Sequence, residues 1–531
     1  MLRGSVPSVS SRSQHSFSRA PQAGIPRSSF NRTFGVKTTF DEGYLVPILA
    51  DEMLPGDTFS LKMHAFARLS TLLFPIMDNL YLETFFFFVP NRLVWDHWEN
   101  FCQVSTGPGD VTSYTIPQQN GPTSIGYAEG SLADYFGIPT LVTNLKPNAL
   151  HFRAYNLIYN EWFRSQDLQS PVTVDVDDGP DSYSDYVLLR RGKRYDYFTS
   201  CLPWPQKGPD VLLPLGSSAP VVPTGNAIPT FSVGSTPTVA QLYATASGSQ
   251  NCIWNVPITG TSGLGAAWDD PKLVADLTDA TASTVNAIRQ AFQTQKFYEK
   301  QARGGTRYTE VIKSHFDVIS PDMRLQRPEY IGGGSTPVII NPVAQTAPTS
   351  GSNALAQLGA YGICAPEAHG FTYSATEHGV VIGLVSVRAD LNYQSGLDRM
   401  WTRQVFTDYY WPVFSHLGEQ AVLNQEIYAQ GNDTDVEVFG YQERYAEYRY
   451  KPSLVTGLFR SNATGSLDSW HLAQDFGSLP VLNDEFIVED APMSRIKAVS
   501  SSYDFLFDAV FSYHCARPMP VFAVPGLIDH F

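Results

Sequence analysis

The chain has 531 residues, and its 43% content of hydrophobic residues excludes a wholly disordered or fibrous protein. Charged residues make up only 16%, against roughly 25% in a typical soluble domain, while aromatic residues make up 13%. A surface so poor in charge suggests that other protein covers much of it. The longest aromatic run, at residues 85–88, is too short to cross a bilayer, so we expect no membrane insertion.

The net charge of −15 is distributed unevenly, because residues 1–40 carry six basic groups and no acidic one. This segment is rich in serine and too poor in apolar residues to fold alone, so we expect a disordered, internal N-terminal arm. The arm either contacts nucleic acid phosphates or is a frayed terminus without a partner, and composition alone favours the frayed terminus. Its basic residues are Arg3, Arg12, Arg19, Arg27, Arg32 and Lys37.

After the arm, the spacing of apolar residues predicts a mostly β protein. Residues 58–68 alternate between apolar and polar side chains, which indicates a half-buried strand. Because the predicted strands lie far apart and no internal repeat is visible, we expect an antiparallel β-sandwich with large insertions. Further strands are predicted at residues 80–89, 380–387, 436–441 and 502–513, and helices at about residues 91–102, 148–168 and 284–301.

A basic cluster in the middle of the chain has two interpretations. Cations interleaved with aromatic rings suit single-stranded nucleic acid, whose bases stack while its phosphates pair with the cations. The alternative is salt bridging to the many acidic groups of the body, and the sequence leaves both open. Arg303 and Arg307, which flank two glycines, form a smaller cluster of the same kind. The main cluster consists of Arg190, Arg191, Lys193 and Arg194, next to Tyr195 and Tyr197.

Residues 211–268 form the most unusual segment, because they include no Asp, Glu, Lys or Arg. A disordered loop is one interpretation. However, the large apolar side chains in it gain about 1.5–3 kcal/mol each on burial, which favours packing against copies of the same chain. The residues that we expect to make these contacts are Leu212, Leu213, Ile228, Phe231, Tyr243, Ile253 and Trp254.

The sequence carries no catalytic signature, so we expect no enzyme, no catalytic residue, no metal site and no cofactor. Five scattered cysteines, none in a C-x-x-C pair, argue against a disulfide framework or a zinc cage. Asp175, Asp177 and Asp181 fail the calcium-loop pattern and indicate a hydrated surface turn.

Acidic residues do leave one alternative function open. Asp433, Asp435 and Glu437 alternate along a predicted strand, which would place them on one face. A glycosidase needs carboxylates on both sides of a cleft, and the sequence does not supply a second set. The alternative hypothesis is therefore a secreted or surface β-sandwich polysaccharide-binding protein or glycosidase, with aromatic side chains lining a sugar groove. A single-strand DNA-binding protein as a further alternative fits poorly with the acidic body.

Several long strings resemble one protein family. The sequence from residue 38 to the C-terminus is similar to the major capsid protein of gokushoviruses, the small single-stranded DNA phages of the Microviridae. The strings are MDNLYLETFFFFVPNRLVW at residues 77–95, YFTSCLPWPQKGP at 197–209, ARGGTRYTEVIKSHF at 302–316, RLQRPEY at 324–330 and HGVVIGLVSVRAD at 378–390.

The resemblance implies an eight-stranded antiparallel jelly roll of the viral capsid type, with long loop and helix insertions. It implies one capsid domain over residues 41–531, in which residues 205–270 form an uncharged protrusion at the threefold axis. Copies would close into a T=1 icosahedral shell around circular single-stranded DNA, after assembly in the host bacterial cytoplasm. The expected partners are the chain itself, the single-stranded DNA genome, an internal scaffolding protein, minor virion proteins and a host cell-surface receptor at the protrusions.

Overall fold

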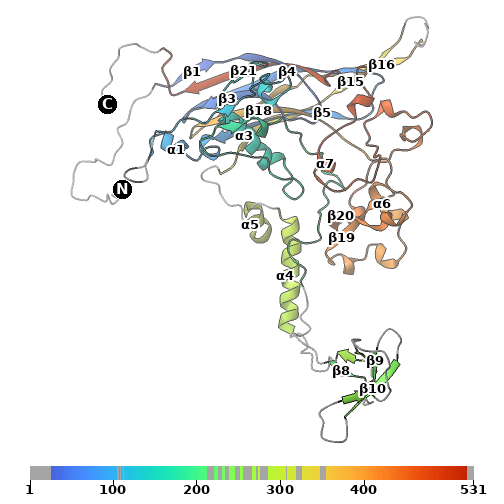
Figure 1. Ribbon diagram of the computed structural model, residues 1–531. Helices are drawn as coiled ribbons and strands as arrows, with labels where there is room; N and C mark the ends of the chain where they lie inside the picture. The colour runs from blue at the N-terminus through green and yellow to red at the C-terminus, as the bar shows by residue number, and fades with distance from the viewer. Residues whose placement is uncertain are drawn as a thin grey trace, which may run out of the picture. The chain divides into compact units, whose positions relative to one another are not determined.

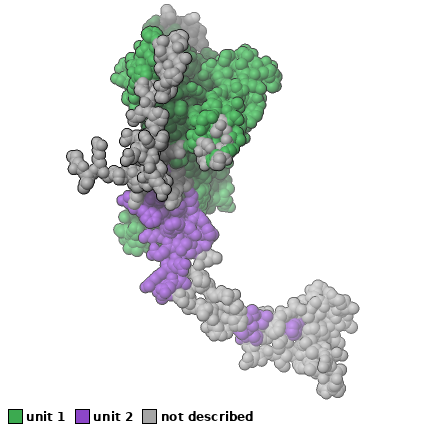
Figure 2. Space-filling model, turned by 90° about the vertical axis from the view of Figure 1, so that its left-hand side faces the viewer, with its two compact units in different colours: residues 1–205, 318–531 green, residues 206–317 purple. Residues whose placement is uncertain are grey.

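The structure is a computed structural model in which the chain forms two compact units (Figure 2). The sandwich unit comprises residues 1–205 and 318–531, and the insertion unit comprises residues 206–317. The structure describes residues 26–104, 107, 109, 111, 113–211, 221–224, 230–233, 238–244, 252–254, 266–270, 273–275, 285–305, 308–317, 326–346 and 355–522.

Among the described residues, two large antiparallel sheets form the body of the sandwich unit, which confirms the mostly β fold class (Figure 1). In the first sheet, β21 lies beside β4, and most of the remaining strands pair with one of these two. Its strands are β1 (Ser28–Asn31), β2 (Phe34–Phe40), β4 (Thr58–Leu72), β15 (Ile339–Ala344), β16 (Leu358–Cys364), β17 (Glu367–Ser374) and β21 (Phe505–Arg517). The second sheet has the order β14 (Glu329–Pro337), β5 (Leu80–Pro90), β18 (Gly379–Ala389), β3 (Val46–Met53).

The core of the sandwich lies between the two sheets, as the alternation of side chains predicts. From β4 and β21, Phe59, Leu61, Phe505 and Phe511 point inward and are fully buried. From the second sheet, alternate residues of β5 and β18 meet them, among them Leu82, Phe86, Phe88, Val381 and Val385. The strands predicted at 58–68, 80–89, 380–387 and 502–513 are confirmed.

The outer faces of the two sheets differ. The second sheet is covered by α3 (Leu150–Ile158) and the chain around it, which bury Phe87, Val89 and Ile382 in a second apolar cluster (Figure 1). On the first sheet, the solvent-facing side of β2, β21, β4 and β17 carries exposed side chains, including Phe66 and Leu506. We call this solvent-facing side the open face.

The predicted helices are only partly confirmed. α4 (Val285–Arg303) matches its prediction, but α3 ends at Ile158, where a single π-helical turn, Tyr159–Phe163, follows. Residues 91–102 form two short turns, Asn91–Leu93 and α1 (Trp98–Phe101). Trp95 between them is fully buried and its indole N–H donates to Asp178 at 2.8 Å, which fixes the chain in a non-helical path.

A smaller lobe of the sandwich unit contains β19 (Glu419–Leu423) paired with β20 (Val438–Glu443) and the short helix α6 (Asn424–Ile427). The strand predicted to carry Asp433, Asp435 and Glu437 is wrong at those positions. Asp433–Val436 is a 3-10 turn, in which Asp435 accepts hydrogen bonds from two backbone N–H groups, those of residues 430 and 431. The other short elements of this unit are α2 (Leu132–Tyr135), α7 (Asp484–Ile487), β6 (Gln119–Asn120) and β7 (Asp181–Ser182).

The described residues of the insertion unit form a four-stranded sheet, a two-stranded sheet and two helices. Gly305, with φ of +93°, adopts the left-handed conformation after α4 and lets the chain turn before α5 (Tyr308–Phe316). No described helix of either unit combines the length and the apolar composition that a bilayer span requires. The strands are β8 (Val221–Pro223), β9 (Thr230–Val233), β10 (Thr238–Ala244), β11 (Cys252–Trp254), β12 (Ala266–Asp270) and β13 (Leu273–Ala275).

Candidate assembly and genome-binding surfaces

The smaller lobe of the sandwich unit exposes large apolar side chains between residues 400 and 417. Trp401 is 72% exposed and Val413 is 82% exposed. Monomeric proteins rarely leave so much contiguous apolar surface in water. We call these residues the aromatic patch: Met400, Trp401, Val405, Phe406, Tyr409, Tyr410, Trp411, Val413 and Leu417.

Hydrogen bonds within the aromatic patch hold its backbone in place. The indole N–H of Trp411 donates to the carbonyl oxygen of Phe406 at 3.0 Å. Asp408 accepts from the backbone N–H groups of residues 404 and 405, at 2.8 and 3.0 Å. The Arg403 guanidinium lies 5.3 Å from the ring centre of Tyr409. The exposed rings are therefore presented by an ordered surface. The sequence alone did not predict this surface, although six aromatic residues fall within positions 401–414.

The first two residues of the basic cluster, Arg190 and Arg191, contact acidic and aromatic side chains of the fold. Arg190 donates to Asp490 at 2.7 Å and lies over the ring of Tyr44. Arg191 forms an ion pair with Glu83, and both side chains are nearly buried. Burial lowers the pKa of Arg191, the effect expected where a cation loses its hydration. These contacts favour the salt-bridge interpretation for both residues.

The second half of the cluster is partly engaged. Lys193 donates to Gln474 at 2.8 Å, its ammonium lies over the ring of Phe486, and burial lowers its pKa to about 8. Arg194 pairs with Asp390 at 3.2 Å and remains 63% exposed. Of the four cluster residues, Arg194 is thus the most accessible to a nucleic acid.

Of the six basic residues predicted for the arm, three precede residue 26, where the described residues begin, and three follow it. Arg3, Arg12 and Arg19 lie outside the described residues. Arg27 donates to the Thr58 hydroxyl at 2.6 Å, Arg32 pairs with Asp51, and Lys37 pairs with Asp508 across β2 and β21. Contact of this segment with nucleic acid stays a prediction.

Residues 28–40 differ from the expected arm, because they are strands of the first sheet. Phe34 stacks on Phe511 with ring centres 4.8 Å apart, and Phe40 stacks on Phe505 at 5.7 Å. The apolar side chains of β2 thus outweigh the basic composition that suggested a free segment.

The residues predicted for self-contact lie in the insertion unit. Phe231 is on β9, and Tyr243 of β10 is in register with Ile253 of β11, beside Trp254. Leu212, Leu213 and Ile228 lie outside the described residues, as does Arg307 of the smaller basic cluster. Arg303 ends α4.

The expected hydrated turn at residues 175–181 is wrong for Asp181, which is buried. The fully buried guanidinium of Arg153 donates to both of its carboxylate oxygens, at 2.8 and 2.5 Å, and to the carbonyl oxygen of Val94 at 3.0 Å. This ion pair ties α3 to the chain that covers the second sheet. Its partners are 28 residues apart, and local spacing gave no signal of it.

A pair of buried carboxyl groups lies beside the basic cluster. Glu42 is 2% exposed and Glu489 is fully buried. Burial raises the pKa of Glu42 well above its usual range, and the neighbouring Glu489 adds to this rise. The raised pKa favours the protonated form of Glu42 beside Glu489, and the backbone N–H of Ala491 donates to Glu42 at 3.2 Å.

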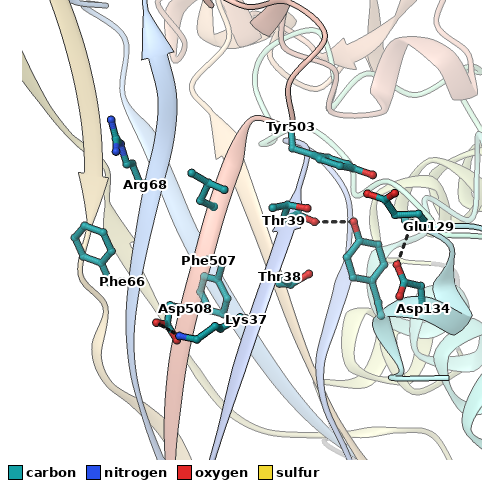
Figure 3. A pocket seen from close by; sticks show the side chains of 13 residues that line it. Lys37, Thr38, Thr39, Phe66, Arg68, Glu129, Asp134, Tyr503, Phe507 and Asp508 are labelled. Atoms are coloured by element: carbon teal, nitrogen blue, oxygen red, sulfur yellow. Dashed lines mark hydrogen bonds and ion pairs between the residues drawn. The ribbon is translucent and has the colours of Figure 1, made fainter. Parts of the chain in front are cut away.

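A hollow of about 580 Å³ borders the open face. Figure 3 shows Phe66 and Arg68 on one side of it and Glu129, Asp134 and Tyr503 on the other, with Lys37 and Asp508 paired between them. One side of the hollow is therefore basic and the other acidic.

Comparison with known proteins identifies the family. The model of a family described as the capsid protein (F protein) matches residues 18–527. The chain is 47% identical over 533 residues to capsid protein VP1 of Bdellovibrio phage phiMH2K, a match that covers 98% of each chain. It is 45% identical to capsid protein VP1 of Chlamydia phage 1, with 96% of this chain and 97% of the relative covered. With capsid protein VP1 of Spiroplasma virus 4 the identity is 34%, over 97% of each chain.

These matches extend over nearly the whole chain and confirm the resemblance to gokushovirus capsid proteins. The exposed aromatic patch agrees with them, because a shell subunit must leave surface for its neighbours to cover. The chain therefore belongs to the capsid F protein family of Microviridae phages, and it is a structural major capsid protein.

Proposed function

We propose that the chain closes into a T=1 icosahedral shell around a circular single-stranded DNA genome, through contacts in which neighbouring copies cover the aromatic patch. The observation that carries the proposal is the ordered exposure of Trp401, Phe406, Trp411 and Val413. Burying such side chains gains about 1.5–3 kcal/mol each, and many modest contacts of this kind add up to a stable closed shell.

The insertion unit serves, in this proposal, as the protrusion at the threefold axis. Support comes from the uncharged stretch of residues 211–268, which is poorly suited to permanent exposure as a single copy. Exposed protrusions built from connecting segments are natural sites of host attachment, so the host cell-surface receptor binds there. The remaining partners are an internal scaffolding protein and minor virion proteins, with assembly in the host cytoplasm.

The N-terminal arm supplies part of the charge that offsets the genome. Arg3, Arg12 and Arg19 precede β1 and add positive charge to a chain whose net charge is −15. Single-stranded DNA carries far more charge than these residues neutralise, so other cations share the task.

Sedimentation of the purified chain tests the proposal. The wild-type chain is expected to form shell-sized particles, and the double variant Trp401→Ser/Val413→Ser is expected to sediment as small species with an unchanged thermal melt. The matched control Ile125→Ser/Leu141→Ser removes two side chains of similar exposure outside the patch and is expected to assemble normally. A wild-type chain that stays monomeric and binds polysaccharide would support the glycan-binding alternative and contradict the proposal.

A further inference from the structure

The open face carries a row of exposed side chains along β4. Lys62, His64, Phe66 and Arg68 face the solvent, whereas the residues between them face the core or its edge. Lys62 and Arg68 are six residues apart on one strand, which places them about 20 Å from each other.

Lys62 and Arg68 differ from most other cations of the sandwich unit. Within the described part of the chain, neither side chain has an ion pair or a hydrogen bond. Arg32, Arg191 and Lys37, by comparison, each contact a carboxylate. An exposed cation without a partner adds nothing to the fold, and it keeps its full charge for an external anion.

Across the sheet, the neighbours of this row leave the positive charge unbalanced. On β21, Leu506 is in register with Arg68 and Ser512 with Lys62. Asp508, in register with Phe66, already pairs with Lys37. Glu367 of β17, in register with His64, is the exposed carboxylate at the other edge of the row. Among the described neighbours within the sheet, the two cations therefore exceed the free carboxylate, while Glu129 and Asp134 lie on the other side of the hollow that Arg68 lines.

Aromatic rings complete the surface. Phe66 is 51% exposed between Lys62 and Arg68, and Tyr361 of the neighbouring strand β16 is 38% exposed. Unpaired bases stack on such rings while their phosphates contact nearby cations, and a flat sheet gives them room. Base-paired nucleic acid offers no free base face to Phe66.

We propose that the open face binds single-stranded nucleic acid, with phosphates at Lys62 and Arg68 and a base stacked on Phe66. The inference deepens the proposed function, on which it rests for the identity of the strand as the enclosed genome. The strand follows β4 and avoids the far side of the hollow in Figure 3, where Glu129 and Asp134 repel phosphates. The open face also continues into β1, which the basic arm precedes.

Titration of the full-length chain with a thymidine 30-mer over a range of salt concentrations tests this inference. Each lost phosphate contact lowers the slope of log K against log salt by about 0.7, so Lys62→Gln/Arg68→Gln is expected to lower it by about 1.4. Phe66→Leu is expected to weaken binding roughly 5- to 150-fold with little change of slope. Lys146→Gln removes an exposed cation that also lacks a described partner but lies off the open face, and it is expected to change neither quantity.

Sedimentation of the same preparations separates this inference from the proposed function. Shells from the Lys62→Gln/Arg68→Gln variant, together with the lowered slope, support it. An unchanged slope overturns the inference and leaves the shell intact as a proposal. Loss of shells in this variant also overturns the inference, because it would mean that a second copy of the chain covers the open face. A wild-type chain that forms no shells contradicts the proposed function, while binding of the 30-mer remains measurable on the free chain.

Discussion

The molecule has two basic regions, the cluster at residues 190–194 and the row of side chains along β4 on the open face. The structure reverses the expectation of which region has cations available to an external anion. In the sequence, the cluster is the denser concentration of positive charge, with four cations in five residues. In the structure, Arg190 and Arg191 pair with carboxylates, whereas Lys62 and Arg68 have no partner among the described residues. Charge density along the chain therefore says little about which cations remain available.

The reason lies in where the carboxylates are. The cluster runs past the acid pair Glu42 and Glu489 and past Glu83, so its cations are close to buried acidic groups. The outward side chains of β4 alternate with core residues and face serine, leucine and valine on β21, together with Asp508, which already pairs with Lys37. Pairing with buried acids stabilises the fold, while unpaired surface cations leave stability unchanged and the surface positive.

The largest expected effect comes from the most buried cation. Replacing Arg153 by Ala leaves Asp181 buried without its partner, and breaking such a pair costs about 3–5 kcal/mol. Chemical denaturation of the unassembled chain measures this loss. Asp177→Asn is the control, because the Asp177 side chain is 78% exposed and its removal is expected to shift the midpoint far less. A small loss for Arg153→Ala would mean that buried pairing does not hold this region together.

Arg191→Gln gives the sharpest contrast with the open face. Glu83 retains Arg388 at 3.0 Å, so the expected loss of stability is smaller, about 1–3 kcal/mol. The salt dependence of DNA binding is expected to stay at the wild-type value. Lys62→Gln/Arg68→Gln should show the reverse, a stability change within about 0.5 kcal/mol and a lowered slope. A lowered slope for Arg191→Gln would indicate that the cluster at residues 190–194 contacts the genome.

The acid pair beside the cluster predicts a pH dependence. The folded chain holds a proton on Glu42 that the unfolded chain loses above about pH 4.3, because burial raises the pKa of Glu42. Its contribution to stability is therefore greatest below that pH and falls as the pH rises towards the raised pKa. Glu42→Gln keeps a donor for Glu489 without a titrating proton, so its advantage over wild type is expected to grow from pH 5 to pH 8. A constant difference across this range, measured by thermal melting, would show that Glu42 is ionised in the fold.

The regular parts of the fold could be predicted from the sequence, because their signal is local. Alternation marked the strands that became β4 and β21, and an unbroken apolar run marked β18, which is buried on both faces. The sequence did not predict strands at residues 28–40. Their basic composition suggested a free arm, whereas β21, the strand with which β2 pairs, lies about 470 residues away along the chain.

The candidate surfaces depend on contacts that no local pattern carries. Arg191 pairs with Glu83, which lies 108 residues away along the chain, and Arg190 pairs with Asp490, which lies 300 residues away. Asp435 lies in a turn and not in a strand, and its carboxylate accepts hydrogen bonds from two nearby backbone N–H groups. The aromatic patch had a local signal in its run of rings, but exposure is a property of the folded lobe.

A density map of the genome-filled particle tests the central claim most directly. We predict that the open face lines the inner surface, with nucleic acid density against Lys62, Phe66 and Arg68, and that a neighbouring copy covers Trp401 and Val413. A map in which the open face points outward, or in which the aromatic patch remains bare on every subunit, would contradict it.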